Sequence, residues 1–226
     1  EQMNLFKDMV CYQEEVRDPS RMAEVLNRVI EKAFRGSAPA QINVPRDYWT
    51  QVIDIELPPI VRFERQGGGK DAIERASNLL SKAKFPVILS GAGVVIGGAI
   101  EECKKLAEKL DAPVCNGYQH NDSFPGSHPL AVGPLGYNGS KAAMELISKA
   151  DVVLALGTRL NPFSTLPGYG IDYWPKNATI IQVDMNPDRI GLTKKVTVGI
   201  CGDAKQVAQQ ILDKLSSDAG NTGRDE

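Results

Sequence analysis

Short apolar runs bounded by turn-forming residues are the feature that most constrains the fold of this chain. They occupy residues 86–90, 113–115, 152–156, 179–183 and 196–200. Amphipathic stretches typical of helices separate most of them, beginning near residues 70, 100, 140 and 204. An apolar run without polar alternation indicates a strand that is buried on both faces, as in a parallel sheet covered by helices. The pattern predicts an α/β fold with a doubly wound, mostly parallel sheet, similar to the Rossmann fold.

The first 50 residues have a simpler pattern. Asp18 precedes Pro19, a capping residue followed by a proline at the first helical position, and predicts a helix that ends at Gly36. Its apolar positions at helical spacing are Met22, Val25, Leu26, Val29, Ile30 and Ala33. A short strand is expected at 40–44, before a proline.

Proline and glycine divide the chain. Leu57-Pro58-Pro59 and Gly67-Gly68-Gly69 interrupt any regular pattern. We therefore expect a first segment at 1–50, a linker at 51–69, the α/β domain at 70–217 and a polar tail at 218–226. The start at Glu1-Gln2-Met3 and the polar tail also suggest a piece of a longer protein.

Composition disfavours several classes of function. The net charge of -2, without a run of Lys or Arg, argues against nucleic-acid binding. The apolar runs are far shorter than the roughly 20 residues of a membrane-spanning helix. The four cysteines, Cys11, Cys103, Cys115 and Cys201, form neither a zinc motif nor a disulfide framework, and we expect reduced thiols in a cytoplasmic protein.

In a doubly wound fold, ligands bind beyond the carboxyl ends of the strands, so residues that follow strands are the candidates. Gly91 and Gly93 follow the first strand of the domain and resemble a dinucleotide fingerprint, but Ile96 occupies the position of its third glycine. The expected ribose-binding acid is also missing after Cys115. A structural strand-to-helix turn is therefore favoured over an NAD site.

Later strand ends supply three more crevice candidates. Gly157 and Arg159 follow the strand at 152–156, and Arg159 offers a guanidinium to a phosphate or carboxylate, or forms a surface ion pair. Asp184 either accepts a hydrogen bond from a ribose hydroxyl or caps the turn at Asn186-Pro187, and capping is favoured.

A polar cluster, Tyr118-Gln119-His120-Asn121-Asp122, lies on the long loop predicted after Cys115. Loops at the ligand-binding edge often carry functional side chains, although ordinary solvation of the loop explains the polarity equally well. His120 and His128 are the only histidines, and neither has carboxylates or thiols at ligand spacing, so no metal site is predicted. No Ser-His-acid arrangement is recognisable either.

Several segments resemble one enzyme family. Pro113-Val114-Cys115-Asn116-Gly117 and Gly133-Pro134-Leu135-Gly136 are similar to the middle domain of thiamine-diphosphate enzymes of the acetolactate synthase group, as are 150–159 and 181–184. Residues 36–47 resemble the close of the family's pyrimidine-binding domain. The resemblance implies that 1–50 is the end of that domain and that 70–217 is the middle domain.

Within this group, segments 6–19, 120–125, 133–137 and 172–175 resemble the members that convert sulfoacetaldehyde and phosphate to acetyl phosphate and sulfite. The resemblance implies an acyltransferase that uses thiamine diphosphate and Mg²⁺, and Tyr118, His120 and Asn121 become substrate-facing candidates. An acetolactate synthase-like carboligase and a non-catalytic nucleotide-binding module are the alternatives. Some relatives bind FAD or ADP in the crevice, for which fold analogy is insufficient support.

The family's catalytic elements are expected outside this chain. Neither the glutamate that activates the cofactor nor the Gly-Asp-Gly motif that holds the metal and diphosphate is recognisable, and Gly202-Asp203-Ala204 lacks the second glycine. We expect no catalytic residue here and an inactive isolated chain. The expected partners are the small anionic substrates and the remaining domains of the same protein, in a homodimer or homotetramer.

Overall fold

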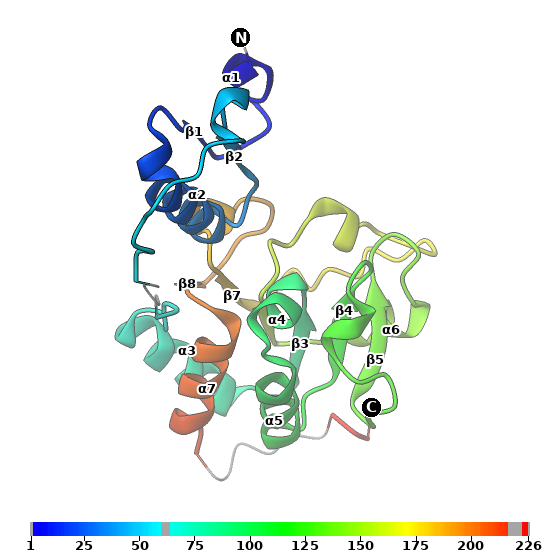
Figure 1. Ribbon diagram of the computed structural model, residues 1–226. Coiled ribbons are helices and arrows are strands. Elements are labelled where there is room, and N and C mark those ends of the chain that lie inside the picture. Colours follow the sequence, from blue (N-terminus) through cyan, green and yellow to red (C-terminus); the bar gives the residue numbers. More distant parts are fainter. Residues whose placement is uncertain (1, 60–63, 217–222, 226) are drawn as a thin grey trace. The chain divides into compact units, whose positions relative to one another are not determined.

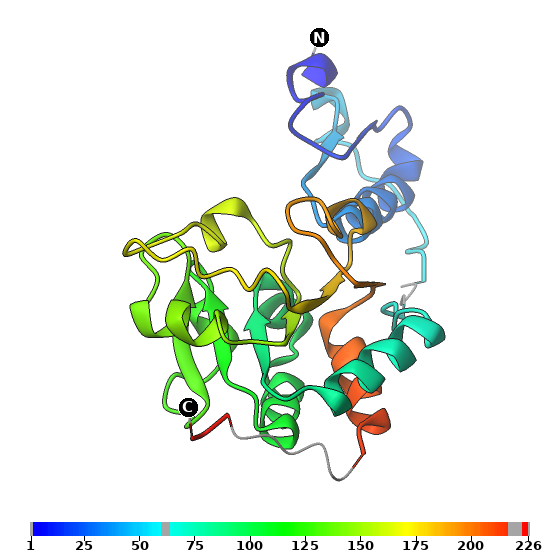
Figure 2. The ribbon, with the colours of Figure 1, turned by 180° about the vertical axis from the view of Figure 1, so that it is seen from behind.

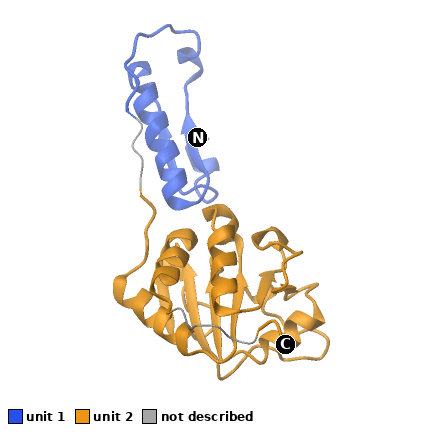
Figure 3. Cartoon of the chain, turned by 90° about the horizontal axis from the view of Figure 1, so that it is seen from below, with its two compact units in different colours: residues 1–63 blue, residues 64–226 orange. Residues whose placement is uncertain are grey.

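The computed structural model describes residues 2–59, 64–216 and 223–225. The chain forms two compact units, Glu1–Phe63 and Glu64–Glu226, and each is described by itself (Figure 3). Residues 60–63 of the predicted linker, and 217–222 and 226 at the tail, lie outside the described residues. Within the described part, no helix is both long and apolar enough to cross a membrane.

The first unit contains a small parallel sheet and one long helix. Its elements are α1 (Gln2–Leu5), β1 (Tyr12–Glu15), η1 (Pro19–Arg21), α2 (Met22–Gly36), β2 (Ala40–Asn43) and η2 (Arg46–Tyr48). Asp18 caps the 3-10 turn η1 as expected, and α2 continues from it. The predicted helix and the strand at 40–44 are confirmed. The pattern did not reveal β1, because its sequence Tyr-Gln-Glu-Glu is mostly polar.

Only a narrow row of α2 is buried. Val25 and Val29 pack with Val16, whereas Leu26 and Ile30, expected on the same face, are 42% and 45% exposed. The expectation that all the apolar positions face a core is therefore wrong for these two residues. A two-stranded sheet is too narrow to cover the wide apolar stripe of the helix.

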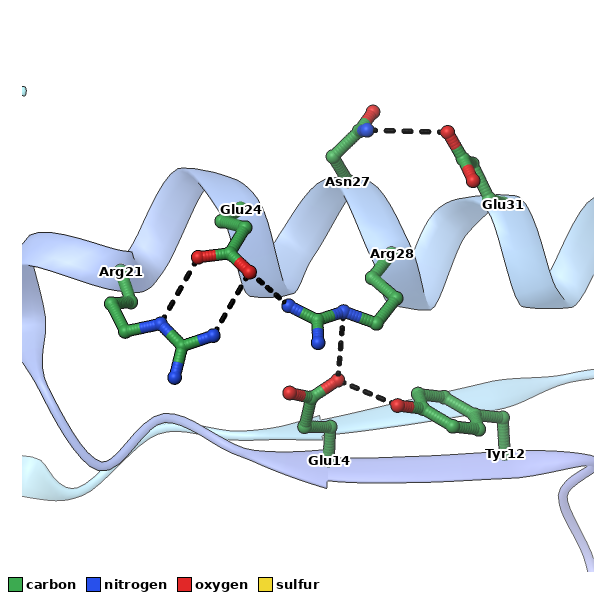
Figure 4. Close-up of polar contacts among 7 residues, drawn as sticks. All are labelled: Tyr12, Glu14, Arg21, Glu24, Asn27, Arg28 and Glu31. Carbon is green, nitrogen blue, oxygen red and sulfur yellow. Dashed lines mark hydrogen bonds and ion pairs between the residues drawn. The ribbon is translucent and has the colours of Figure 1, made fainter. Parts of the chain in front are cut away.

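Polar side chains also connect α2 to β1 (Figure 4). Arg28 on α2 pairs with Glu24 and with the Glu14 carboxylate on β1, at 2.5 and 3.5 Å. The Tyr12 hydroxyl donates to the same Glu14 carboxylate at 2.7 Å, and this hydrogen bond raises the pKa of Tyr12. These contacts align the helix with the strand beneath it.

The second unit is the predicted doubly wound domain (Figures 1 and 2). Its helices and strands are α3 (Lys70–Lys82), β3 (Pro86–Ser90), α4 (Ala92–Gly97), α5 (Ile100–Leu110), β4 (Val114–Gly117), η3 (Asn121–Ser123), β5 (Ala131–Leu135), α6 (Lys141–Ile147), β6 (Val152–Leu156), η4 (Pro162–Ser164), β7 (Thr179–Asp184), η5 (Pro187–Arg189), β8 (Val198–Cys201) and α7 (Ala204–Lys214). The described strands form one sheet in the order β5-β4-β3-β6-β7-β8, and every pair is parallel.

Two apolar cores cover the two faces of this sheet. On one face, Ile88, Leu154 and Ile181 pack with the apolar sides of α3, α5 and α7. On the other face, Val153 and Ala155 pack with α6 and with the segment around the buried Tyr173. Because successive strand residues face opposite cores, both faces of the central strands must be apolar, which explains the apolar runs at β3 and β6.

The prediction of one long loop after Cys115 is wrong in one respect, because this segment contains the strand β5. Gly133 and Pro134 interrupted the strand pattern, and proline is tolerated here because β5 is an edge strand. Asn116 and Gly117, expected to follow a strand, are the last residues of β4. The turn after β3 also contains a short helix, α4, which ends at Gly97 and is capped by Gly98 before α5 begins.

The end of the predicted linker contacts the second unit. The Arg65 guanidinium donates to the Gly97 carbonyl at 2.7 Å and to the Asp203 carboxylate at 3.0 Å. Gln210 on α7 donates to the Gly67 carbonyl at 2.8 Å. The described linker residues carry no helix or strand, but these bonds hold residues 65–67 against α4 and α7.

The loops after β3 and β6 approach each other through glycines. The Gly93 amide donates to the Gly157 carbonyl at 2.8 Å. A Cβ atom on Gly91 would lie 2.6 Å from the Thr158 Cβ, and one on Gly93 would lie 2.6 Å from the Gly157 Cα. Gly157 also has φ +61°, a region that glycine favours. Backbone contact between the two loops therefore requires these glycines.

We predict that Gly157→Ala destabilises the protein by roughly 3 kcal/mol or more, because the new Cβ would lie 2.7 Å from the Gly93 Cα in addition to the backbone cost. Gly170→Ala is the matched control: its φ is +72° and no atom lies within 4 Å of the added Cβ. It should cost about 1 kcal/mol. Denaturant unfolding of both variants measures the difference, and equal losses would contradict the loop contact.

We also predict a thiol-dependent loss of stability at alkaline pH. Burial raises the pKa of Cys103 and of Cys115 to about 12, from 9.0 for a free thiol. Between these values the unfolded chain releases thiol protons that the folded chain retains, so stability is complete below about pH 9 and falls as the pH rises towards 12. Each thiol contributes a slope of about 1.4 kcal/mol per pH unit.

Unfolding free energies measured between pH 7 and 11 test this expectation. Cys103→Ala and Cys115→Ala should each flatten the alkaline slope, whatever their effect on stability at pH 7. Cys11→Ala removes an exposed thiol and is the control. Identical slopes in all variants would refute the assignment.

Candidate functional site

The strand order places a crevice at the centre of the second unit's sheet. From β3 the chain proceeds outward to β4 and β5, and from β6 it proceeds in the other direction to β7 and β8. In such sheets the ligand crevice lies at the carboxyl ends of the two strands where the order reverses, here β3 and β6. All the residues predicted for the site lie at this edge: Gly91, Gly93, Tyr118, His120, Asn121, Gly157, Arg159 and Asp184.

The structure brings Gly91, Gly93 and Gly157 together at the reversal point itself. The contact described above uses the Gly93 amide within the protein. Ile96, which replaces the third glycine of a dinucleotide fingerprint, is 75% exposed on α4. The packing of the two loops thus gives these glycines a structural role.

Arg159 is presented by a rigid loop. Its side chain is exposed and makes no hydrogen bond or ion pair with the residues that the structure describes. The next residue, Leu160, is buried with φ +52°, an unusual conformation for leucine. The Leu160 amide donates to the Thr158 hydroxyl at 3.2 Å, and the Leu160 carbonyl accepts from the Thr193 hydroxyl at 2.6 Å. These bonds fix the backbone beside an available guanidinium.

Asp184 ends β7 and caps a turn. One of its carboxylate oxygens accepts from the Asn186 amide at 2.8 Å, and Asn186 caps the following turn, η5. This is the turn-capping geometry favoured from the sequence. Asp184 is 8% exposed, so little of the carboxylate reaches the crevice.

Gln182 is a residue of this edge that sequence reasoning missed. It is buried in β7, where its amide donates to the carbonyls of Thr158 and Arg189 at 3.1 Å each and its oxygen accepts from the Gly191 amide at 2.9 Å. It therefore joins the loops after β6 and β7. A single polar residue inside the apolar run 179–183 was the available signal.

A buried hydrogen-bond network anchors the loop after β4. The Asn116 side chain donates to the Ser123 hydroxyl at 2.8 Å and to the His120 carbonyl at 3.4 Å. The Ser90 hydroxyl at the end of β3 donates to the Ser123 carbonyl at 3.3 Å. The His120 amide donates to the Gly117 carbonyl at 2.8 Å and closes the turn.

This anchored loop presents hydrogen-bonding side chains at its surface. The His120 imidazole is 3.9 Å from the Asp122 carboxylate and is 37% exposed. Asn121 is exposed, and its side chain has no hydrogen bond within the described part of the chain. Tyr118 is half-buried, with its ring against Tyr137. Such hydrogen-bond donors can bind an anionic ligand.

The described residues of this chain do not fit the family's metal-diphosphate site. No group of three His, Cys, Asp or Glu side chains among the described residues could hold a metal ion. Asp203, in the segment nearest to the family motif, is 1% exposed and accepts from the amides of Lys205 and Gln206 at 3.1 and 3.2 Å. Its other oxygen bonds to Arg65. The helix cap and this ion pair use the carboxylate fully.

Comparison with known proteins finds relatives in sequence and a solved structure with the same fold. The chain is 80% identical over its full length to the probable sulfoacetaldehyde acetyltransferase of Rhizobium meliloti (strain 1021), and 34% identical over 94% of its length to the probable acetolactate synthase large subunit of Methanocaldococcus jannaschii. It spans 38% and 37% of their lengths, respectively. The benzoylformate decarboxylase of Polynucleobacter necessarius has the same fold, with a TM-score of 0.78 at 21% identity, over 98% of this chain and 42% of that one.

A family model matches most of the second unit. It describes the central domain of thiamine pyrophosphate enzymes and covers residues 73–211. This range extends from α3 to α7 and includes the whole parallel sheet. The family resemblance read from the sequence is confirmed. The chain belongs to the thiamine pyrophosphate enzyme family, whose central domain its second unit forms.

Proposed function

We propose that the whole protein is a sulfoacetaldehyde acetyltransferase, which converts sulfoacetaldehyde and phosphate to acetyl phosphate and sulfite. One observation supports this assignment most strongly. Identity to a relative with that name is 80% across all 226 residues, compared with 34% for a relative named as an acetolactate synthase. The difference favours the sulfonated substrate over the keto acids of the carboligases.

In this proposal, thiamine diphosphate and Mg²⁺ bind to other parts of the protein. The described residues of this chain do not fit the metal, because Asp203 is fully used by its helix cap and ion pair. When bound, thiamine diphosphate supplies an electron sink for the cleavage. This chain would supply the scaffold and one wall of the substrate path, in a cytoplasmic homodimer or homotetramer.

Two alternatives differ from this proposal in the acceptor or in the ligand that the protein binds. An acetolactate synthase-like carboligase would transfer the two-carbon unit to a keto acid rather than to phosphate. A non-catalytic nucleotide-binding module would retain FAD, ADP or a similar ligand in the crevice near Arg159. The unpaired guanidinium is the observation that favours this second alternative.

We predict that the purified whole protein, supplied with thiamine diphosphate and Mg²⁺, releases sulfite from sulfoacetaldehyde and forms acetyl phosphate in equal amounts. Both products should require phosphate, because phosphate is the proposed acetyl acceptor. Sulfite is measured by the colour that it releases from an aromatic disulfide reagent. Acetyl phosphate is measured as the hydroxamate that it forms with hydroxylamine. Acetolactate formed from pyruvate, with no sulfite from sulfoacetaldehyde, would establish the carboligase instead.

We further predict that the loop after β4 contacts an anionic substrate. His120→Ala or Asn121→Ala in the whole protein should lower kcat/KM for sulfoacetaldehyde or phosphate by roughly tenfold or more, about 1.4 kcal/mol of transition-state stabilisation. Stability should change by less than about 0.5 kcal/mol, because neither side chain belongs to the buried Asn116 network.

Ser127→Ala, at an exposed position of the same β4–β5 connection, is the matched control and should leave both rates unchanged. Thermal unfolding of each variant separates a kinetic effect from a loss of folded protein. Unaltered kinetics in both His120→Ala and Asn121→Ala would remove the loop from the substrate path.

A further inference from the structure

The loops after β4 and β5 begin side by side. These strands are parallel neighbours, and Gly117 is paired in register with Leu135. The residues that follow these strands, Tyr118 after β4 and Gly136-Tyr137 after β5, therefore lie at the same edge of the sheet. The two tyrosine rings meet edge to face, with centroids 6.4 Å apart and planes at 79°. Tyr137 thus belongs to the same surface as the loop that carries His120 and Asn121.

The backbone on both sides of Tyr137 is held in place. Its amide donates to the Phe163 carbonyl at 2.8 Å, and the Gly139 amide donates to the Gly136 carbonyl at 2.7 Å. Gly136 has φ +86°, and a Cβ there would lie 2.6 Å from the Ser164 Cα. The close contact between the loops after β5 and β6 fixes the backbone that presents Tyr137, which is 57% exposed. Little backbone conformational entropy therefore remains to be lost when a ligand binds.

The hydroxyl groups of the six tyrosines differ in their partners. Those of Tyr12, Tyr48, Tyr169 and Tyr173 donate to protein oxygens. Those of Tyr118 and Tyr137 donate to no described residue. The two tyrosines with available hydroxyls are therefore the pair whose rings meet at this edge of the sheet.

The surroundings of this pair suit an anion that neutral donors bind. Residues 133–140 and 160–171 contain no Asp, Glu, Lys or Arg, in a chain of which 24% is charged. No carboxylate on these two segments would repel an anion, and on the loop after β4 the Asp122 carboxylate lies beside the His120 imidazole, at 3.9 Å. A phenol hydroxyl forms short, strong hydrogen bonds to charged oxygens.

We propose that Tyr137 is a further substrate-binding residue, whose hydroxyl donates to a tetrahedral oxyanion, either the sulfonate of the aldehyde or the phosphate acceptor. Tyr118 supports it through the ring contact and offers a second hydroxyl. This inference rests on the proposed function and adds a residue that the sequence did not single out. The two sources share the same chemistry, three equivalent oxygens with negative charge, and kinetics distinguishes them.

Tyr137→Phe tests the proposal in the whole protein, because it removes the hydroxyl and keeps the ring. We expect KM for one of the two anions to rise roughly tenfold, as for the loss of a hydrogen bond to a charged group, while kcat and the other KM change little. A rise for sulfoacetaldehyde identifies the sulfonate, and a rise for phosphate identifies the acceptor. The melting temperature should stay at its wild-type value.

Tyr169→Phe is the matched control, because Tyr169 is similarly exposed and its hydroxyl donates within the protein, to the Gly139 carbonyl at 3.2 Å. It should leave both KM values unchanged. Unchanged KM values in Tyr137→Phe, or equal changes in the two variants, would overturn the proposal.

A second measurement does not depend on turnover. Binding of ethanesulfonate and of inorganic phosphate to the cofactor-free whole protein can be followed by NMR, and Tyr137→Phe should weaken the binding of one of them. Equal affinities in both proteins for both anions would overturn the role of Tyr137 even if acetyl phosphate is formed. Conversely, weaker anion binding in the variant without acetyl phosphate formation would retain the oxyanion site and reject the proposed reaction.

Discussion

Burial of both faces of a parallel sheet is the constraint on which the second unit depends. Its inner strands, β3, β4, β6 and β7, are buried on both faces, so each face needs its own layer of helices and loops. The chain meets this need by proceeding outward from β3 in one direction and outward from β6 in the other. That arrangement creates a reversal point at the centre of the sheet, and the candidate site lies there because of it.

The fold was largely predictable from the sequence, because the buried strands β3 and β6 have uninterrupted or nearly uninterrupted apolar sequences. β5 was not, because Gly133 and Pro134 contradict strand propensity and only the edge position makes them acceptable. β1 was missed because its polar residues pair with α2 and β2 rather than enter an apolar core. Local pattern thus identifies strands inside a sheet and misses those whose environment is set by distant partners.

The site was less predictable than the fold. Strand ends indicated Gly93, Arg159 and Asp184, but the sequence could not show that Gly93 and Gly157 contact each other, since 64 residues (157 − 93) separate them along the chain. Gln182 and Tyr137 were missed for the same reason. Their roles depend on which loops are neighbours across the sheet, and that order appears only when the strands are assembled.

The central pairing of β3 with β6 has a consequence for the order of folding. β6 follows β3 only after the chain has completed β4, β5 and α6, so the middle of the sheet joins strands that are distant in sequence. Closing this longer loop costs somewhat more conformational entropy than pairing β3 with β4, or β6 with β7, which are joined by more local segments. The topology therefore favours pairing within each half of the sheet before β3 pairs with β6. The glycine contact across the reversal point would then form last, and the crevice would be completed only when the two halves meet.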